Sequence, residues 1–75
     1  MTKDQIFNFL DLCEDGEYIY VYLQGKLTPI ITGGSTGMDI LLQEELIEIV
    51  TEDQNIIIAQ FDYKELQMIS NMQLL

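Results

Sequence analysis

Residues 17–23 read EYIYVYL, a run of aromatic and β-branched residues that alternates between two faces. Such residues favour a half-buried β-strand because they pack well on a pleated surface. Successive side chains of a strand point to opposite sides, so Tyr18, Tyr20 and Tyr22 share one face and the aliphatic residues between them share the other. The run therefore predicts the first strand of a sheet.

The residues that follow predict a return strand. Gln24-Gly25-Lys26 has turn composition, and residues 27–32 are again mostly apolar. Pro29 has no N–H to donate to a ladder, so this second strand is expected at a sheet edge or beside a bulge. Residues 33–37 (GGSTG) then predict a flexible connection.

A second hairpin is predicted farther along the chain. Residues 46–50 and 56–61 are apolar runs that flank the turn-like residues 51–55. The preceding residues 38–42 alternate like a strand, although apolar positions within 38–50 also fit a helical stripe. If residues 46–50 form a strand, residues 38–42 are expected to form another strand, or the same strand before a bulge.

Two helices are predicted, one near each end of the chain. Thr2 followed by Gln5 fits a capping box, and an amphipathic stripe extends over residues 3–14 until Asp15-Gly16 ends it. Asp62 with Glu65 repeats the capping pattern. A second helix is expected there, with Leu66, Ile69 and Met72 on one side.

Together these elements predict a single α+β domain over residues 1–75. It would be a small, strongly curved antiparallel sheet of about five short strands, covered by an N-terminal and a C-terminal helix. An N-terminal helix followed by a five-strand meander is also similar in outline to an SH3-like or Sm-like barrel, which is the alternative fold. That resemblance rests on element order alone.

Composition excludes several classes of function. The chain has 13 Asp and Glu against three Lys, with no Arg and no His, which gives a net charge of −10. It therefore lacks an imidazole base and a bidentate phosphate clamp, and its field repels nucleic acid. A single Cys and no apolar run of about 20 residues predict a cytoplasmic protein without a membrane span. We expect a non-enzymatic protein that binds no cofactor and no nucleic acid directly.

Three features that could carry chemistry favour ordinary structural roles. Cys13 has Glu14 and Asp15 as neighbours, which raise a thiol pKa, so a buried core thiol is predicted. The glycine-rich residues 33–37 lack the Lys-Ser/Thr of a phosphate-binding loop and lead instead to Asp39. The acidic clusters lack EF-hand spacing, so no structural metal site is predicted.

Charge and tyrosine content together suggest a partner surface. Dense carboxylates can occupy a basic groove that otherwise holds nucleic acid, and tyrosine is enriched in protein interfaces. The protein is therefore hypothesised to be a nucleic-acid mimic, such as an inhibitor encoded by a phage or mobile element, that binds a basic nucleic-acid-handling host protein. Solubility alone also explains the acidity, and core packing also explains the tyrosines. The candidate partner-binding residues are Glu44, Glu45, Glu48, Glu52, Asp53, Tyr18, Tyr20 and Tyr22.

Self-assembly is the alternative function. Hydrophobic residues make up 48% of the chain, more than so small a fold is expected to hide. The C-terminal residues 68–75 are too apolar for a free tail, so they are expected to dock on the sheet or on a second copy. A homodimer or a larger oligomer, including an Sm-like ring, would result.

Overall fold

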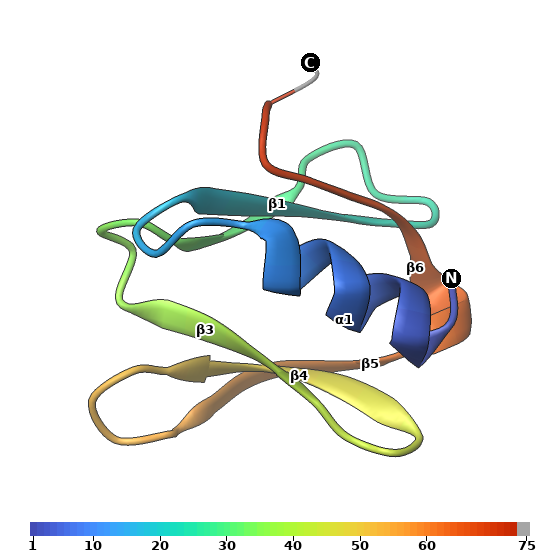
Figure 1. Ribbon diagram of the computed structural model, residues 1–75. Coiled ribbons are helices and arrows are strands. Elements are labelled where there is room, and N and C mark those ends of the chain that lie inside the picture. Colours follow the sequence, from blue (N-terminus) through green and yellow to red (C-terminus); the bar gives the residue numbers. More distant parts are fainter. Residues whose placement is uncertain (74–75) are drawn as a thin grey trace.

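The computed structural model describes residues 1–73, which form two small sheets with a helix beside them (Figure 1). The elements are the α-helix α1 (Lys3–Leu12), the strands β1 (Tyr18–Leu23), β2 (Ile30–Gly33), β3 (Met38–Leu42), β4 (Leu46–Thr51) and β5 (Ile57–Asp62), the 3₁₀ helix η1 (Tyr63–Glu65), and the strand β6 (Leu66–Ser70).

The predicted N-terminal helix and its capping box are confirmed. The Thr2 side chain accepts a hydrogen bond from the Gln5 backbone N–H at 3.2 Å, and the Gln5 side chain accepts one from the Thr2 N–H at 2.9 Å. The helix ends at Leu12, two residues earlier than expected, because Cys13 already has an extended backbone. Gly16, with φ of +87°, lies in the turn that leads to β1.

The strands form two three-stranded antiparallel sheets instead of one curved sheet. The first sheet has the order β2-β1-β6 and the second the order β3-β4-β5. Residues 34–37 form the turn between β2 and β3, where the Thr36 N–H donates to the Gly33 carbonyl at 3.0 Å, so this turn carries the chain from one sheet to the other. Over residues 1–73 the two sheets do not close into the barrel that was the alternative fold.

Residues 38–42, which the sequence left ambiguous, form a strand. β3 pairs with β4 over its whole length, from Met38 opposite Thr51 to Leu42 opposite Ile47. Met38, Ile40 and Leu42 pack against the core, as expected for alternate residues of a strand with one buried face. The hairpin of β4 and β5 is confirmed as well.

The predicted C-terminal helix is wrong. Asp62 does cap a turn, since its carboxylate accepts a hydrogen bond from the Lys64 N–H at 3.0 Å, but η1 is only three residues long and β6 follows. In the pairing of β1 with β6, Leu23 lies opposite Leu66 and Tyr22 lies opposite Met68. Two consecutive residues of β1 thus face two residues of β6 that are two positions apart, which is a β-bulge. The bulge lets Leu66 and Ile69 both face the core although they are three residues apart, a spacing that imitates a helical stripe.

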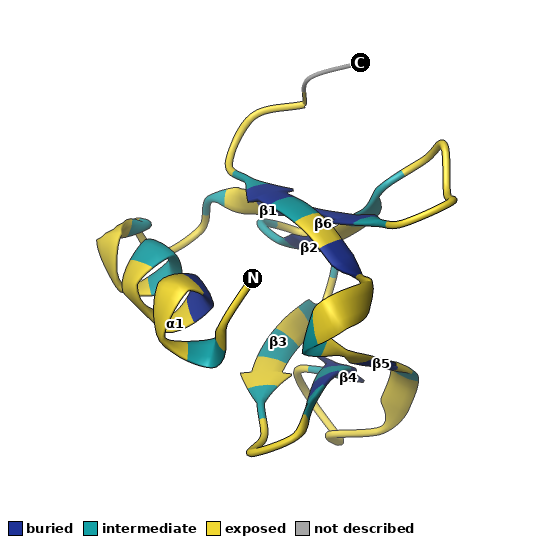
Figure 2. Cartoon of the chain, turned by 90° about the vertical axis from the view of Figure 1, so that its right-hand side faces the viewer, coloured by how far each residue is buried: buried dark blue, intermediate teal, exposed yellow. Residues whose placement is uncertain are grey.

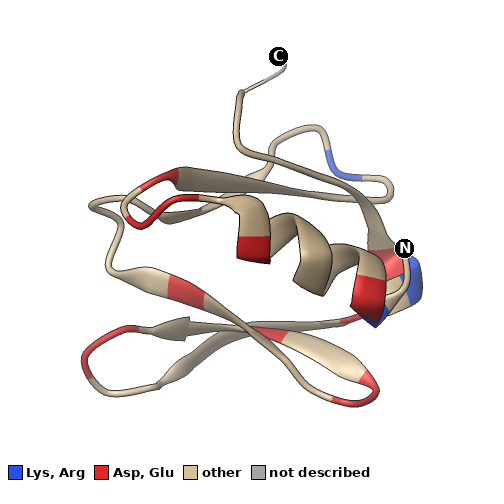
Figure 3. Ribbon diagram, viewed as in Figure 1, with Lys and Arg blue, Asp and Glu red and all other residues tan. Residues whose placement is uncertain are grey.

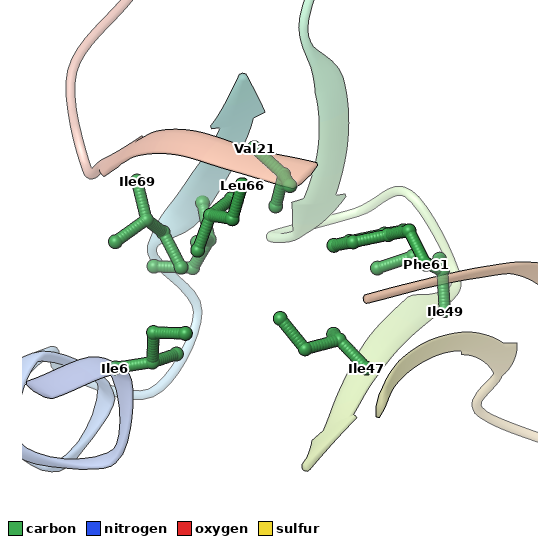
Figure 4. Packing of buried hydrophobic residues seen from close by; sticks show 8 residues of the cluster. Ile6, Val21, Ile47, Ile49, Phe61, Leu66 and Ile69 are labelled. Carbon is green, nitrogen blue, oxygen red and sulfur yellow. The ribbon is translucent and has the colours of Figure 1, made fainter. Parts of the chain in front are cut away.

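The core lies between the two sheets and is completed by α1. In Figure 2 the helix lies beside the gap between the sheets, and in Figure 4 its residue Ile6 points toward Ile69 of the first sheet and Ile47 of the second. Ile6 and Ile49 have no exposed surface. Thr32 is the polar residue in this interior, and its hydroxyl donates to the Ile19 carbonyl at 3.2 Å.

The C-terminal end of the described chain does not bury its last large side chain. Met68 and Ile69 belong to β6, whereas Met72 is 63% exposed. The expected docking of Leu74 and Leu75 falls outside the described residues. Among residues 1–73, no helix has both the length and the apolar character that a membrane crossing needs.

Candidate functional site

Four of the five predicted acidic residues lie at two opposite ends of the second sheet. Glu44 and Glu45 belong to the turn between β3 and β4, and Glu52 and Asp53 belong to the turn between β4 and β5. The six-residue strand β4 separates the two turns, a span of about 20 Å at 3.3 Å per residue. The structure therefore does not bring these carboxylates together into one patch.

Two of these carboxylates already have partners within the molecule. Glu44 lies 3.5 Å from the Lys3 ammonium in an ion pair with a highly exposed carboxylate, a geometry that contributes little to stability. Glu48, in the middle of β4, accepts hydrogen bonds from the side-chain amides of Gln43 at 3.0 Å and Gln60 at 2.7 Å. Glu48 is thus tied to the surface of its own sheet.

The three candidate tyrosines differ in accessibility. Tyr18 is 42% exposed and Tyr22 only 5%, while Tyr20 lies between them in burial. The Tyr18 hydroxyl lies 2.7 Å from the Ser35 hydroxyl, and this hydrogen bond lowers the pKa of Tyr18. Its ring lies directly over Gly34, where a Cβ atom would come within 2.5 Å of the ring. Tyr18 is the one of the three that presents a large accessible surface.

A different set of carboxylates lies at one end of the molecule, which we call the acidic end. The chain passes through this end at the turn between α1 and β1, at the start of β3 and at the turn between β4 and β5. Figure 3 shows acidic segments there and the lysines on the other side of the molecule. Lys3 starts α1, Lys26 follows β1, and Lys64 lies in η1. The acidic end consists of Glu14, Asp15, Glu17, Asp39, Glu52 and Asp53.

An open depression of about 350 Å³ lies at the acidic end. Apolar residues such as Leu10, Ile19 and Ile40 share its lining with polar ones, and no lysine is among the described residues that line it. The loops around it are joined by backbone hydrogen bonds, including one from the Glu52 N–H to the Gly37 carbonyl at 2.9 Å. The carboxylate-bearing residues that line the depression are Glu14, Asp15, Glu17, Asp39 and Glu52.

Glu17 is a carboxylate of the depression whose two oxygens both accept hydrogen bonds. One of its oxygens accepts a hydrogen bond from the Glu14 N–H at 2.8 Å, and the other accepts one from the Asn71 side-chain amide at 2.9 Å. The Glu14 N–H first and the Asn71 amide second lower the pKa of Glu17, because both bonds favour the charged form. Glu17 therefore keeps its negative charge at neutral pH while it links β1 to the segment after β6.

Cys13 lies in the same depression but is not activated. Burial raises the pKa of its thiol, and the nearby charge of Glu17 raises it further. The Sγ donates to the Phe9 carbonyl at 3.4 Å, and the side chain packs against the core. A thiol in this environment is a weak nucleophile. Cys13 was predicted to be a buried core thiol, and the structure shows it packed against the core but only partly buried.

The depression does not have the geometry of a metal centre. Within residues 1–73, no three Asp, Glu, Cys or His side chains lie close enough together to hold one ion. A cationic group larger than a metal ion suits this lining better. Its several hydrogen-bond donors can contact carboxylates that lie too far apart to share one ion. The ammonium of lysine and the planar guanidinium of arginine are groups of this kind.

Part of this site was not predicted from the sequence. Glu52, Asp53 and Tyr18 were candidates, whereas Glu14, Asp15, Glu17 and Asp39 were not assigned a partner role. The order of the expected strands could have revealed them. When antiparallel strands follow one another along the chain, every second turn lies at the same end, so acidic turns that are distant in sequence can come together. Comparison with known proteins adds no assignment, since no family model, no curated protein and no solved structure matches this chain.

Proposed function

We propose that this protein acts without catalysis by binding a basic partner protein through its acidic end. The observation that carries the proposal is the depression at that end, where five residues with carboxylates line the same hollow as several apolar residues and all lysines of the chain lie elsewhere. A partner whose own function is to hold nucleic acid would present the complementary charge. We further propose that occupation of such a surface is the biological effect, as in an inhibitor encoded by a phage or a mobile element.

The distribution of charge supports association with a defined orientation. Six of the 13 acidic residues lie at the acidic end, and no basic residue of the chain accompanies them. The opposite end carries Lys3 and Lys64 among its acids, so the field there is weaker. A basic partner would be attracted most strongly to the acidic end, because complementary potentials steer encounter and set orientation.

Tyr18 supplies a contact that charge alone lacks. Its ring lies against Gly34, which lines the depression, with the side chain partly accessible and its hydroxyl held by Ser35. A tyrosine fixed in this way loses little side-chain entropy when a partner covers it. Buried aromatic contacts hold a complex together, whereas exposed charges mainly affect the rate of association.

A titration of the ¹⁵N-labelled protein with a decapeptide of lysine tests the proposal. The expected result is a set of chemical-shift changes centred on residues 14–17, Asp39 and residues 52–53. Changes centred on Glu44 and Glu45 would place the contact at the other end of the sheet. Absence of any change at low salt would contradict binding of basic partners altogether.

Self-assembly is the second candidate function, and exposed isoleucines favour it. Ile56, Ile57 and Ile58 are 54%, 50% and 53% exposed. Ile56 precedes β5, and Ile57 and Ile58 begin it; β5 is an edge strand of the second sheet. An exposed apolar stretch on an edge strand is a site where another chain can pair.

Light scattering at micromolar concentration tests this second candidate. If the β5 edge joins copies, Ile58→Lys should convert a dimer or larger oligomer into a monomer. Leu27→Lys is the matched control, because Leu27 is 88% exposed in the loop between β1 and β2. A wild-type protein that is monomeric at this concentration would contradict self-assembly.

A further inference from the structure

A second depression neighbours the first one. It has a volume of about 410 Å³ and lies between α1 and β3. Phe7 and Leu41 line it and are 58% and 37% exposed. In the view of Figure 1 the helix α1 runs between β1 and β3. The full lining is Phe7, Leu10, Asp11, Ile40, Leu41 and Leu42.

The two depressions are neighbours that share two lining residues, and we call the pair the trough. Leu10 of α1 and Ile40 of β3 line both of them. The first depression lies at the acidic end, and the lining of the second is apolar apart from Asp11. The trough therefore changes from strongly negative to apolar between its two depressions.

We infer that this trough binds a short extended segment of the partner in which a basic side chain lies close in sequence to large apolar side chains. The inference rests on the proposed function and names the chemistry of the segment recognised. The basic side chain would enter the acidic depression, and the apolar side chains would cover Phe7 and Leu41. Charge complementarity decides which depression takes the basic side chain, because only one of the two is lined by several carboxylates.

The dimensions of the lining elements set the spacing of the segment. From Asp39 to Leu42 the strand β3 rises about 10 Å, at 3.3 Å per residue. An extended peptide covers this distance in about three residues. The apolar side chains should therefore lie two or three positions from the basic one.

Three synthetic peptides of equal length test the inference. The first, acetyl-Gly-Ser-Arg-Ser-Leu-Leu-Ser-Gly-amide, carries both elements. The second replaces Arg by Gln, and the third replaces the two Leu by Ser. Fluorescence anisotropy with a labelled form of each peptide gives the dissociation constants. We expect the first peptide to bind about tenfold more tightly than either of the others, since each matched peptide lacks one of the two contacts.

Variants of the protein locate the apolar contact. Phe7→Ser and Leu41→Ser should each weaken binding of the first peptide and leave binding of the lysine decapeptide unchanged. Leu12→Ser is the matched control, because Leu12 is 84% exposed on the same helix and does not line the trough. Because Phe7 and Leu41 are partly exposed already, the variants should fold, which a ¹⁵N correlation spectrum confirms.

The outcomes separate this inference from the proposed function. Equal binding of the Arg-containing peptides with and without Leu would overturn the inference, and the proposed function would stand. A loss of affinity in Leu12→Ser equal to that in Phe7→Ser would also overturn it. Failure of both the lysine decapeptide and the first peptide to bind would overturn the proposed function and the inference together.

Discussion

At the scale of single residues, Gly34 determines how Tyr18 lies beside the acidic end. Gly34 has φ of +51°, and a Cβ atom there would meet the Tyr18 ring. Gly37, in the same turn, has φ of +73° but nothing within 4 Å of such an atom. Both glycines have a left-handed backbone, but only at Gly34 would an added Cβ atom collide with another side chain.

We predict that Gly34→Ala destabilises the protein more than Gly37→Ala. Gly37→Ala should cost about 1–2 kcal/mol of unfolding free energy, because a left-handed backbone strains any residue with a Cβ. Gly34→Ala adds the displacement of the Tyr18 ring. Urea unfolding of both variants measures the difference, and equal losses would mean that the ring moves aside without cost.

Glu17 connects the acidic end to the pH dependence of stability. Its pKa in the folded protein lies below the ordinary value of 4.5, since the Glu14 N–H and the Asn71 amide favour the charged form. The stability that this shift contributes is fully present above about pH 4.5 and is lost as the pH falls through the folded value. Wild-type protein should therefore lose more stability between pH 7 and pH 3 than Glu17→Gln does.

Urea midpoints at the two pH values measure this difference between wild type and Glu17→Gln. Glu45→Gln, in the exposed turn at the other end of the second sheet, is the control for the removal of one charge. If Glu17→Gln and wild type respond to acid identically, the hydrogen bonds of Glu17 do not favour its ionised form.

At the scale of elements, strand β6 is where local signals and the tertiary structure disagree. The apolar spacing of Leu66 and Ile69 predicts a helix, but the bulge in the β1–β6 ladder makes the same spacing face the core from a strand. By contrast, α1 and the strands β1, β2, β4 and β5 follow from capping, alternation and turn composition, which are local, whereas the same patterns left β3 open between strand and helix. Pairing with a distant strand and the division into two sheets depend on contacts that no local pattern contains.

The observed strand β6 and the helix expected from the sequence predict different losses of unfolding free energy for substitutions in this region. As observed, Ile69 is 9% exposed and Met72 is 63% exposed. Ile69→Ala should therefore cost about 2–5 kcal/mol of unfolding free energy, as buried aliphatic truncations do, and Met72→Ala less than about 0.5 kcal/mol. A helix would place both side chains on one packed face, so comparable losses in urea unfolding would contradict the strand β6.

At the scale of the whole molecule, the arrangement of charge matters more than its total. The net charge of −10 is evident from composition, and it led to the prediction of a basic partner. Which carboxylates act together depends on the fold, because Glu14 and Glu52 are far apart in sequence and line one depression. Neighbours in sequence such as Glu48 and Glu52 are separated along β4 instead.

The central claim is that the acidic end, and not the overall negative charge, binds basic partners. Two double variants with the same net charge test it most directly: Asp39→Asn with Glu52→Gln at the acidic end, and Glu44→Gln with Glu45→Gln at the opposite end. The measurement is the dissociation constant of the lysine decapeptide at 0.15 M salt, where the screening length of about 8 Å isolates the two ends. Our account predicts about tenfold weaker binding for the first variant, from two Coulomb contacts of about 0.7 kcal/mol each, and less than about twofold for the second. Equal weakening in both variants would contradict it.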